Sequence, residues 1–165
     1  HRRLSIQDTS QLGQQPMESQ CGRFVVTYNG EIYNFVELRQ KLEGMNCRFN
    51  SGSDTEVLVE SISKLGIDQT ISSLEGMFAF CCLDKIRNSV YLVRDRFGEK
   101  PLYYGTSRSG VIFASELKIL MVSSSFEKKV DAHALASYFK YGYVPDPQCI
   151  FQKCNKSYSD SKLSN

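Results

Sequence analysis

Two patterns meet in the stretch FVVTYNGEIYNFVELRQKLEG, residues 24–44. The β-branched and aromatic residues at 24–28 predict a strand that ends at Asn29-Gly30, a dipeptide typical of a tight hairpin turn. Asn34, followed three residues later by a glutamate, forms a capping-box pattern, which predicts a helix over 35–43. The stretch therefore predicts a strand, a turn and a helix in quick succession.

The next block repeats this order. We expect a short strand at 47–49 and a polar turn at 51–53. Apolar residues at helical spacing then predict a helix that ends before Gly66. Either Ser53 or Asp54 would cap its first turn.

From residue 77 the apolar pattern changes to the period of strands. Strands are predicted at 77–84, 89–95, 101–105 and 111–115, arranged as an antiparallel meander, and helices at 117–122 and 131–142. Helices followed by strands favour an α+β fold with a largely antiparallel sheet. The last residues, 153–165, are polar and aperiodic, so we expect an atypical tail there without regular structure.

Composition excludes several classes of function. The chain has 165 residues, of which 41% are hydrophobic and 23% charged, with a formal net charge of +2. Such a charge provides no strong field for nucleic acid, and no apolar run approaches the length of a membrane span. The start of the chain lacks the apolar stretch of a signal peptide, so we expect a cytoplasmic protein with six reduced cysteines. The spacing of those cysteines is unlike that of zinc ligands, and we expect no metal.

Three polar clusters remain as candidates for chemistry: Arg3 in HRRLSI, Asn29-Gly30-Glu31 in YNGEIYN, and Asp54 in SGSDTEV. Taken singly, each has a structural explanation, because Asn-Gly forms turns, aspartate caps helices and arginine is a common surface residue. Taken together, they match an amino acid substrate that carries a carboxamide. Arg3 can bind its α-carboxylate, Asp54 its α-ammonium, and the Asn29 amide with the Gly30 N–H can form an oxyanion hole.

The sequences of these clusters and of the segments around them resemble those of a known family, the glutaminase domain of class II glutamine amidotransferases. Within it they most closely resemble the glutamine-hydrolysing asparagine synthetases. The resemblance runs from His1 to about Phe151. It is carried by HRRLSIQD (1–8), QPM (15–17), VTYNGEIYNFVELR (26–39), SGSDTEVLV (51–59), LEGMFAFCCLD (74–84), RDRFGEKPLYYG (94–105), FASELK (113–118) and YGYVPDPQCIF (141–151).

The resemblance implies an N-terminal nucleophile hydrolase fold, which is a four-layer αββα sandwich of two antiparallel sheets. It also implies a reaction in which an N-terminal cysteine thiolate attacks the carboxamide of L-glutamine, so that glutamate and ammonia result. By position, Asn29 and Gly30 would form the oxyanion hole. The substrate-binding residues would be Arg3, Leu4, Ile6, Glu31 and Asp54.

The resemblance also implies that parts of the enzyme lie outside this chain. The family's nucleophile precedes the position of Arg3 by several dozen residues, so we expect residues 1–152 to be a partial domain that lacks N-terminal strands and is inactive by itself. Cys21 is an internal residue without a free α-amino group, and it is not expected to replace the nucleophile. A downstream synthetase domain, normally in cis, would bind ATP and Mg²⁺ and amidate aspartate. The glutaminase domain itself would need no cofactor. Whether the protein forms a homodimer stays an open question.

The motif RDRFGEKPLYYG is expected to be structural or to face the synthetase domain, with Arg94 and Asp95 in a buried or interfacial ion pair. Two alternatives to the leading hypothesis also stay open. One is a non-catalytic remnant or interaction module that keeps this fold without the nucleophile. The other is an amidotransferase domain that serves a different ammonia acceptor.

Overall fold

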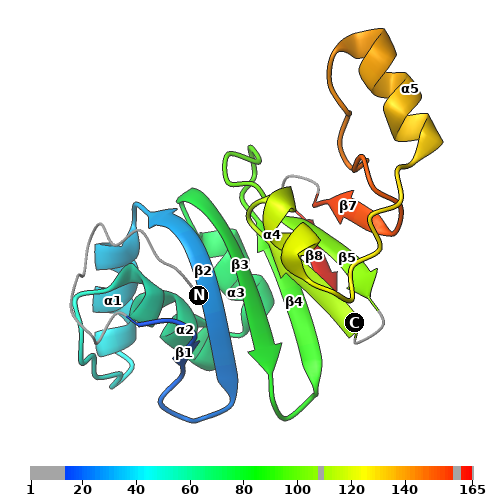
Figure 1. Ribbon diagram of the computed structural model, residues 1–165. Helices are drawn as coiled ribbons and strands as arrows, with labels where there is room; N and C mark the ends of the chain where they lie inside the picture. The colour runs from blue at the N-terminus through cyan, green and yellow to red at the C-terminus, as the bar shows by residue number, and fades with distance from the viewer. Residues whose placement is uncertain (1–13, 108–109, 158–160, 165) are drawn as a thin grey trace. The chain divides into compact units, whose positions relative to one another are not determined.

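The computed structural model describes residues 14–107, 110–157 and 161–164. Within these ranges the chain forms eight strands and five helices (Figure 1). They belong to two compact units, one that extends to Val93 and includes the residues from Lys162, and one that runs from Arg94 to Ser161. Each unit has its own sheet, so the structure is α+β, as the order of patterns predicted.

The first unit is built on a five-stranded sheet with the order β1-β2-β3-β4-β8. Strand β2 is antiparallel to both β1 and β3. Its register with β3 runs without a break from the pair Phe24↔Asp84 to the pair Ile32↔Gly76. The strands are β1 (Met17–Glu18), β2 (Phe24–Ile32), β3 (Gly76–Asp84), β4 (Ser89–Arg94) and β8 (Ser161–Ser164).

The prediction of a turn at Asn29-Gly30 is wrong. Both residues lie inside β2, opposite Ala79 and Phe78 of β3, and the chain turns only after Ile32. The reason is that Gly30 is needed for close approach of the backbones. A Cβ at Gly30 would lie 2.2 Å from the carbonyl oxygen of Met77, a contact that no side chain can make.

Three helices follow β2, and Figure 1 shows them on one face of the sheet. They are α1 (Phe35–Glu43), α2 (Asp54–Leu65) and α3 (Ile67–Ser73). The first two confirm the predicted helices, whereas α3 was not predicted. The predicted strand at 47–49 is wrong, because these residues have no regular structure.

The capping box expected at Asn34 is also wrong in its contacts. Asn34 occupies the N-cap position of α1, but its side chain makes no cap hydrogen bond. Its amide instead donates to the carbonyl of Ser73 and accepts from the N–H of Glu75, at 2.8 and 3.1 Å. Asn34 therefore fastens the start of α1 to the segment that enters β3.

The core of the first unit lies between the helices and the sheet. Val26 and Ile32 of β2, Val57 and Ile62 of α2, and Cys82 of β3 are all fully buried. Burial of side chains of this size stabilises a fold by about 2 kcal/mol each. This core fixes α2 against β2, and that packing positions the candidate site.

The second unit has a three-stranded antiparallel sheet with the order β6-β5-β7. The single meander predicted from residue 77 onward is therefore wrong, since its strands are divided between two sheets. Both predicted helices are present, and Asp131 caps α5 by accepting from two backbone N–H groups. The elements are β5 (Tyr103–Ser107), β6 (Gly110–Ala114), β7 (Cys154–Lys156), α4 (Leu117–Val122) and α5 (Ala132–Tyr141).

Residues 153–157 correct the expectation of an irregular tail. Three of them form β7 and pair with β5 from Tyr103 to Gly105. Cys154 is buried, and the N–H of Ser157 donates to the carbonyl of Leu102 at 2.8 Å. Pairing with a neighbouring strand gives this polar segment a structure that its own composition does not predict.

The loop that begins RDRFGEK contains two buried charges, and the ion pair expected between Arg94 and Asp95 is wrong. Asp95 is buried and accepts hydrogen bonds from three backbone N–H groups of its own loop. Arg94 donates to three backbone carbonyls and pairs with Asp146 at 3.2 Å. Each buried charge is thus satisfied mainly by backbone groups, which shapes the loop.

Candidate functional site

Asp54 is placed by the start of α2. The helix is capped by Ser53, whose hydroxyl accepts from the N–H of Thr55 at 3.1 Å. The preceding turn is held by the carboxylate of Glu56, which accepts from the N–H and the hydroxyl of Ser51 at 2.7 Å each. Because Ser53 performs the capping, the carboxylate of Asp54 is not needed for it. Of the two predicted caps, Ser53 is therefore the one found in the structure, and the carboxylate of Asp54 can make other contacts.

The carboxylate of Asp54 reaches β2. The phenol of Tyr28 donates to its Oδ2 at 2.6 Å, and the N–H of Ile32 donates to the same oxygen at 3.3 Å. Asp54 is 7% exposed and Tyr28 is 5% exposed. Burial, together with the charge of Asp54, raises the pKa of Tyr28 above its ordinary value, so this phenol stays a donor.

Gln15 extends the contact between β2 and α2. Strand β1 pairs only Met17 and Glu18 with β2, so the backbone N–H of Tyr28 lies past its end. The side-chain carbonyl of Gln15 accepts from this N–H at 2.6 Å, and the amide of Gln15 lies 3.5 Å from the hydroxyl of Thr55. The motif QPM thus contributes a buried amide that supports the site.

The candidate oxyanion-hole residues lie in the part of β2 that is accessible to solvent. Asn29 is exposed, and Gly30 and Glu31 are half-buried, whereas Tyr28 and Ile32 on either side are buried. Since Asp54 is bonded to those two buried residues, the structure brings the YNGEIYN and SGSDTEV motifs together at this end of β2. The roles assigned to Asn29, Gly30, Glu31 and Asp54 stay predictions. Arg3, Leu4 and Ile6, the other predicted substrate-binding residues, lie outside the described residues.

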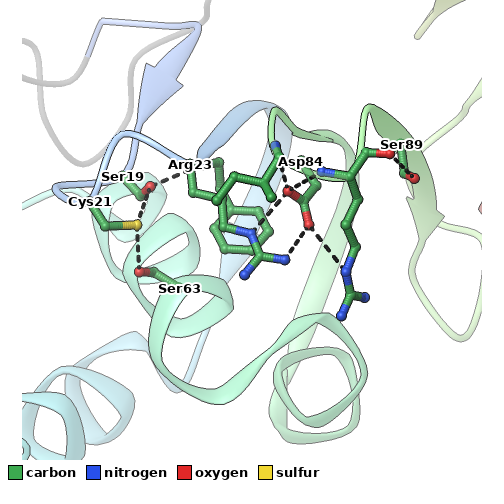
Figure 2. A network of polar contacts seen from close by, with 9 residues as sticks. Ser19, Cys21, Arg23, Ser63, Asp84 and Ser89 are labelled. Atoms are coloured by element: carbon green, nitrogen blue, oxygen red, sulfur yellow. Dashed lines mark hydrogen bonds and ion pairs between the residues drawn. The ribbon is translucent and has the colours of Figure 1, made fainter.

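Cys21 lies at the other end of β2. It is the only exposed cysteine among the six, and its sulfur lies 3.3 Å from the hydroxyl of Ser19 and 3.2 Å from that of Ser63 (Figure 2). These hydrogen bonds lower the pKa of the Cys21 thiol. Gly30 nevertheless lies six residues along β2 from Phe24, so at about 3.3 Å per residue the strand separates it from the Cys21 end by about 20 Å. Cys21 is therefore not placed to attack a carboxamide held near Gly30.

Sequence reasoning missed two residues of this site, Tyr28 and Gln15. Both occur in segments that carry the family resemblance, but a tyrosine in a strand normally indicates a core residue, and a glutamine before a proline carries no specific signal. A buried hydroxyl needs a partner, and an aspartate at a nearby helix start is such a partner. That combination is the signal that could have identified Tyr28.

The described residues can also be compared with the requirements of a metal site and of a membrane span. Across 14–107, 110–157 and 161–164, no group of three His, Cys, Asp or Glu side chains gathers as metal ligands. None of the helices in these ranges is long and apolar enough to cross a bilayer.

The chain is similar in sequence to a known family. The family model described as "Glutamine amidotransferase domain" matches residues 1–161. Asparagine synthetase [glutamine-hydrolyzing] 1 of Bacillus subtilis is 42% identical over 149 residues, which is 90% of this chain and 23% of that protein. Asparagine synthetase [glutamine-hydrolyzing] 2 of the same organism is 47% identical over 119 residues, 72% of this chain and 15% of that protein. The chain thus spans less than a quarter of either relative.

A solved structure shares the fold. The glutamine phosphoribosylpyrophosphate amidotransferase from B. subtilis, complexed with ADP and GMP, superposes with a TM-score of 0.62 at 27% sequence identity. The match covers 75% of this chain and 29% of that one. Its likeness supports the fold expected from the resemblance, with antiparallel sheets and flanking helices.

Proposed function

The chain belongs to the glutamine amidotransferase domain family, and from this premise we propose that it binds L-glutamine as the glutaminase part of a glutamine-hydrolysing asparagine synthetase. The observation that carries the proposal is the placement of Asp54, a buried carboxylate held beside the Asn29-Gly30 segment by two donors of β2. A carboxylate in such a position is suited to an α-ammonium group.

In the proposed reaction a thiolate adds to the carboxamide carbon of glutamine, and the carbonyl oxygen becomes an oxyanion. The amide of Asn29 and the N–H of Gly30 would donate to this oxyanion, and one such donor is worth about 3 kcal/mol in the transition state. Collapse of the intermediate releases ammonia and leaves a thioester, which water hydrolyses to glutamate. Arg3 would bind the α-carboxylate, and Glu31, Leu4 and Ile6 would line the substrate.

The residues of this chain then bind and orient the substrate and stabilise charge, while the nucleophile would be an N-terminal cysteine, as the family resemblance implies. We further propose that the ammonia goes to aspartate in a synthetase domain in cis, where ATP and Mg²⁺ supply the activation. The names of the B. subtilis relatives support this acceptor. A cytoplasmic location belongs to the same proposal.

Calorimetric titration of the chain with L-glutamine tests the binding step. We expect saturable binding that Asp54→Asn weakens at least tenfold, because the neutral amide loses a charge-assisted contact worth about 1.5–3 kcal/mol. Equal affinity in the wild type and Asp54→Asn would contradict the ammonium assignment. Absence of glutamine binding by the wild type would favour the non-catalytic module instead.

The acceptor is tested separately on the complete gene product. Glutamine consumption that rises on addition of aspartate and ATP is expected. Consumption that responds to a different acceptor, such as phosphoribosylpyrophosphate, would show that the domain serves another amidotransferase, of the kind represented by the structural relative.

A further inference from the structure

We propose that Tyr28 is a positioning residue, which fixes the carboxylate of Asp54 so that one defined oxygen faces the substrate ammonium. The inference rests on the function proposed above and adds a residue to its site. Tyr28 donates to Oδ2 of Asp54 at 2.6 Å, and the N–H of Ile32 donates to the same oxygen. None of the hydrogen bonds that described residues make to Asp54 is to Oδ1.

Two donors on one oxygen restrict the rotation of the carboxylate. The bond from Ile32 is long, at 3.3 Å, so the short bond from the phenol carries most of the restraint. The pKa of Tyr28 is raised, which keeps the proton on the phenol throughout the physiological range. Oδ1 is then presented to a ligand in one orientation, without a reorganisation cost on binding.

The hydroxyl of Tyr28 can be tested apart from its ring. The ring belongs to the core shared by β2, β3 and α2, and phenylalanine would fill the same space. Tyr28→Phe therefore removes one hydrogen bond to Asp54 and keeps the packing. Tyr91 is a buried tyrosine of the same core, so Tyr91→Phe is a matched control for the loss of a hydroxyl.

The experiment compares two ligands by calorimetry on the chain. One is L-glutamine, and the other is 4-carbamoylbutanoate, which is glutamine without its α-amino group. We expect Tyr28→Phe to reduce the preference for glutamine about tenfold while the affinity for 4-carbamoylbutanoate stays unchanged. A purely structural role would lower both affinities together, and Tyr91→Phe should change neither. Circular dichroism verifies that each variant is folded.

The outcomes separate this inference from the function on which it rests. If Asp54→Asn abolishes the preference and Tyr28→Phe retains it, the positioning role is refuted and the proposed function stands. If the wild type shows no preference for glutamine, the proposed function fails, and the positioning role fails with it. A double variant provides a second measure, because its loss should equal that of Asp54→Asn alone. Additive losses would refute the coupling between Tyr28 and Asp54.

A different observation carries a second inference, which does not depend on glutamine binding. We infer that Cys149 and Cys154 form an oxidation site, at which a low-molecular-weight disulfide such as oxidised glutathione converts the two thiols into an intramolecular disulfide. Gln148 and Asn155 form an antiparallel bridge. Because the chain direction is antiparallel, Cys149, which follows Gln148, lies opposite Cys154, which precedes Asn155. Opposite residues of antiparallel strands have Cα atoms about 4.5–5.5 Å apart, within the range of disulfides.

The two thiols also share a hydrogen bond. Both are 5% exposed in the core of the second unit, and a hydrogen bond from Cys154 lowers the pKa of Cys149 below its ordinary value. When local opening of the second unit exposes Cys149, its thiolate would attack the glutathione disulfide and expel one glutathione thiolate. Cys154, after losing its proton, would then attack the mixed disulfide and expel the second. Two protein thiols are thus oxidised while one glutathione disulfide is reduced to two thiols.

Tryptic mapping without reduction tests the site. Cleavage after Lys140, Lys153 and Lys156 would separate the two cysteines into peptides 141–153 and 154–156. After incubation with oxidised glutathione we expect these peptides to be joined, with a mass two hydrogens below their sum, and to separate in Cys149→Ser and Cys154→Ser. Free thiols at both positions, or stable glutathione on one of them, would refute the inference. Burial raises the pKa of Cys81 and Cys82 to about 12, so these thiols serve as unreactive internal controls.

Discussion

Replacing Asp84 by asparagine is expected to remove a pH-dependent contribution to the stability of the first unit. Asp84 is 1% exposed at the end of β3, and Arg23 donates to both of its oxygens at 2.9 and 2.6 Å (Figure 2). Two backbone N–H groups of the following turn also donate to its Oδ1. The hydrogen bonds from Arg23 are the largest cause that lowers the pKa of Asp84 from 3.8 to about 2.

The magnitude and the sign follow from this pKa. At about 1.4 kcal/mol per pKa unit, the difference between the folded and the ordinary value corresponds to about 2 kcal/mol of stability. The folded pKa is the lower one, so the stabilisation is complete above about pH 5 and is lost as the pH falls toward 2. Asp84→Asn should therefore lower the free energy of unfolding by about 2 kcal/mol at pH 7 and by much less at pH 2.

Urea denaturation followed by far-UV circular dichroism measures this effect, because the chain contains no tryptophan for fluorescence. Glu75→Gln is the control, since Glu75 is an exposed carboxylate of the same unit, and its replacement should change stability by less than about 0.5 kcal/mol. A difference between wild type and Asp84→Asn that stays constant from pH 7 to pH 2 would refute the ionic origin of the stabilisation.

Three further predictions, the first with a control substitution, concern close backbone contacts and the side chains that accept from backbone N–H groups. Gly30→Ala should destabilise the chain by about 3 kcal/mol or more in urea denaturation, because the new Cβ would lie 2.2 Å from a carbonyl oxygen of β3. Gly52→Ala, where no atom lies within 4 Å, should be nearly neutral, and equal effects would contradict the argument. Asp95→Ala should cost about 3 kcal/mol, since three N–H groups lose their acceptor, and a loss below about 1 kcal/mol would contradict this reading. Asp131→Ala should cost about 1 kcal/mol, seen as faster hydrogen exchange of the first-turn amides of α5, and unchanged exchange would argue against the cap.

The parts of the fold that local signals control could be predicted from the sequence. Helix α2 follows from apolar spacing and a serine cap, and α5 from Asp131 and Gly142 at its ends. The short helix α3 was missed, because seven residues, IDQTISS, contain too few apolar positions to establish a period. Its existence depends on the core of the first unit, to which Ile67 and Ile71 contribute.

The sequence predicted Asp54 and the Asn29-Gly30 pair as substrate contacts, which stay predictions, and it missed the supporting residues Tyr28 and Gln15. Asp54 and the Asn29-Gly30 pair were identified because their chemistry matches an amino acid amide. The local pattern of Asn-Gly, however, indicated a turn, and only the long-range pairing with β3 keeps these residues in a strand. The bond from Tyr28 to Asp54 joins residues 26 positions apart, and a pattern within one window of sequence cannot reveal it.

The close approach of β2 and β3 makes glycine necessary at two positions, each independently of the other. A Cβ at Gly30 would collide with the carbonyl oxygen of Met77, and a Cβ at Gly76 would collide with that of Glu31, at 2.1 Å. Each glycine thus makes room for the carbonyl group of the residue that follows the other. No second substitution at the partner glycine can relieve the first collision, because the obstacle is main chain. Any library that aims to reshape this end of the sheet should hold both glycines constant and vary the side chains around them.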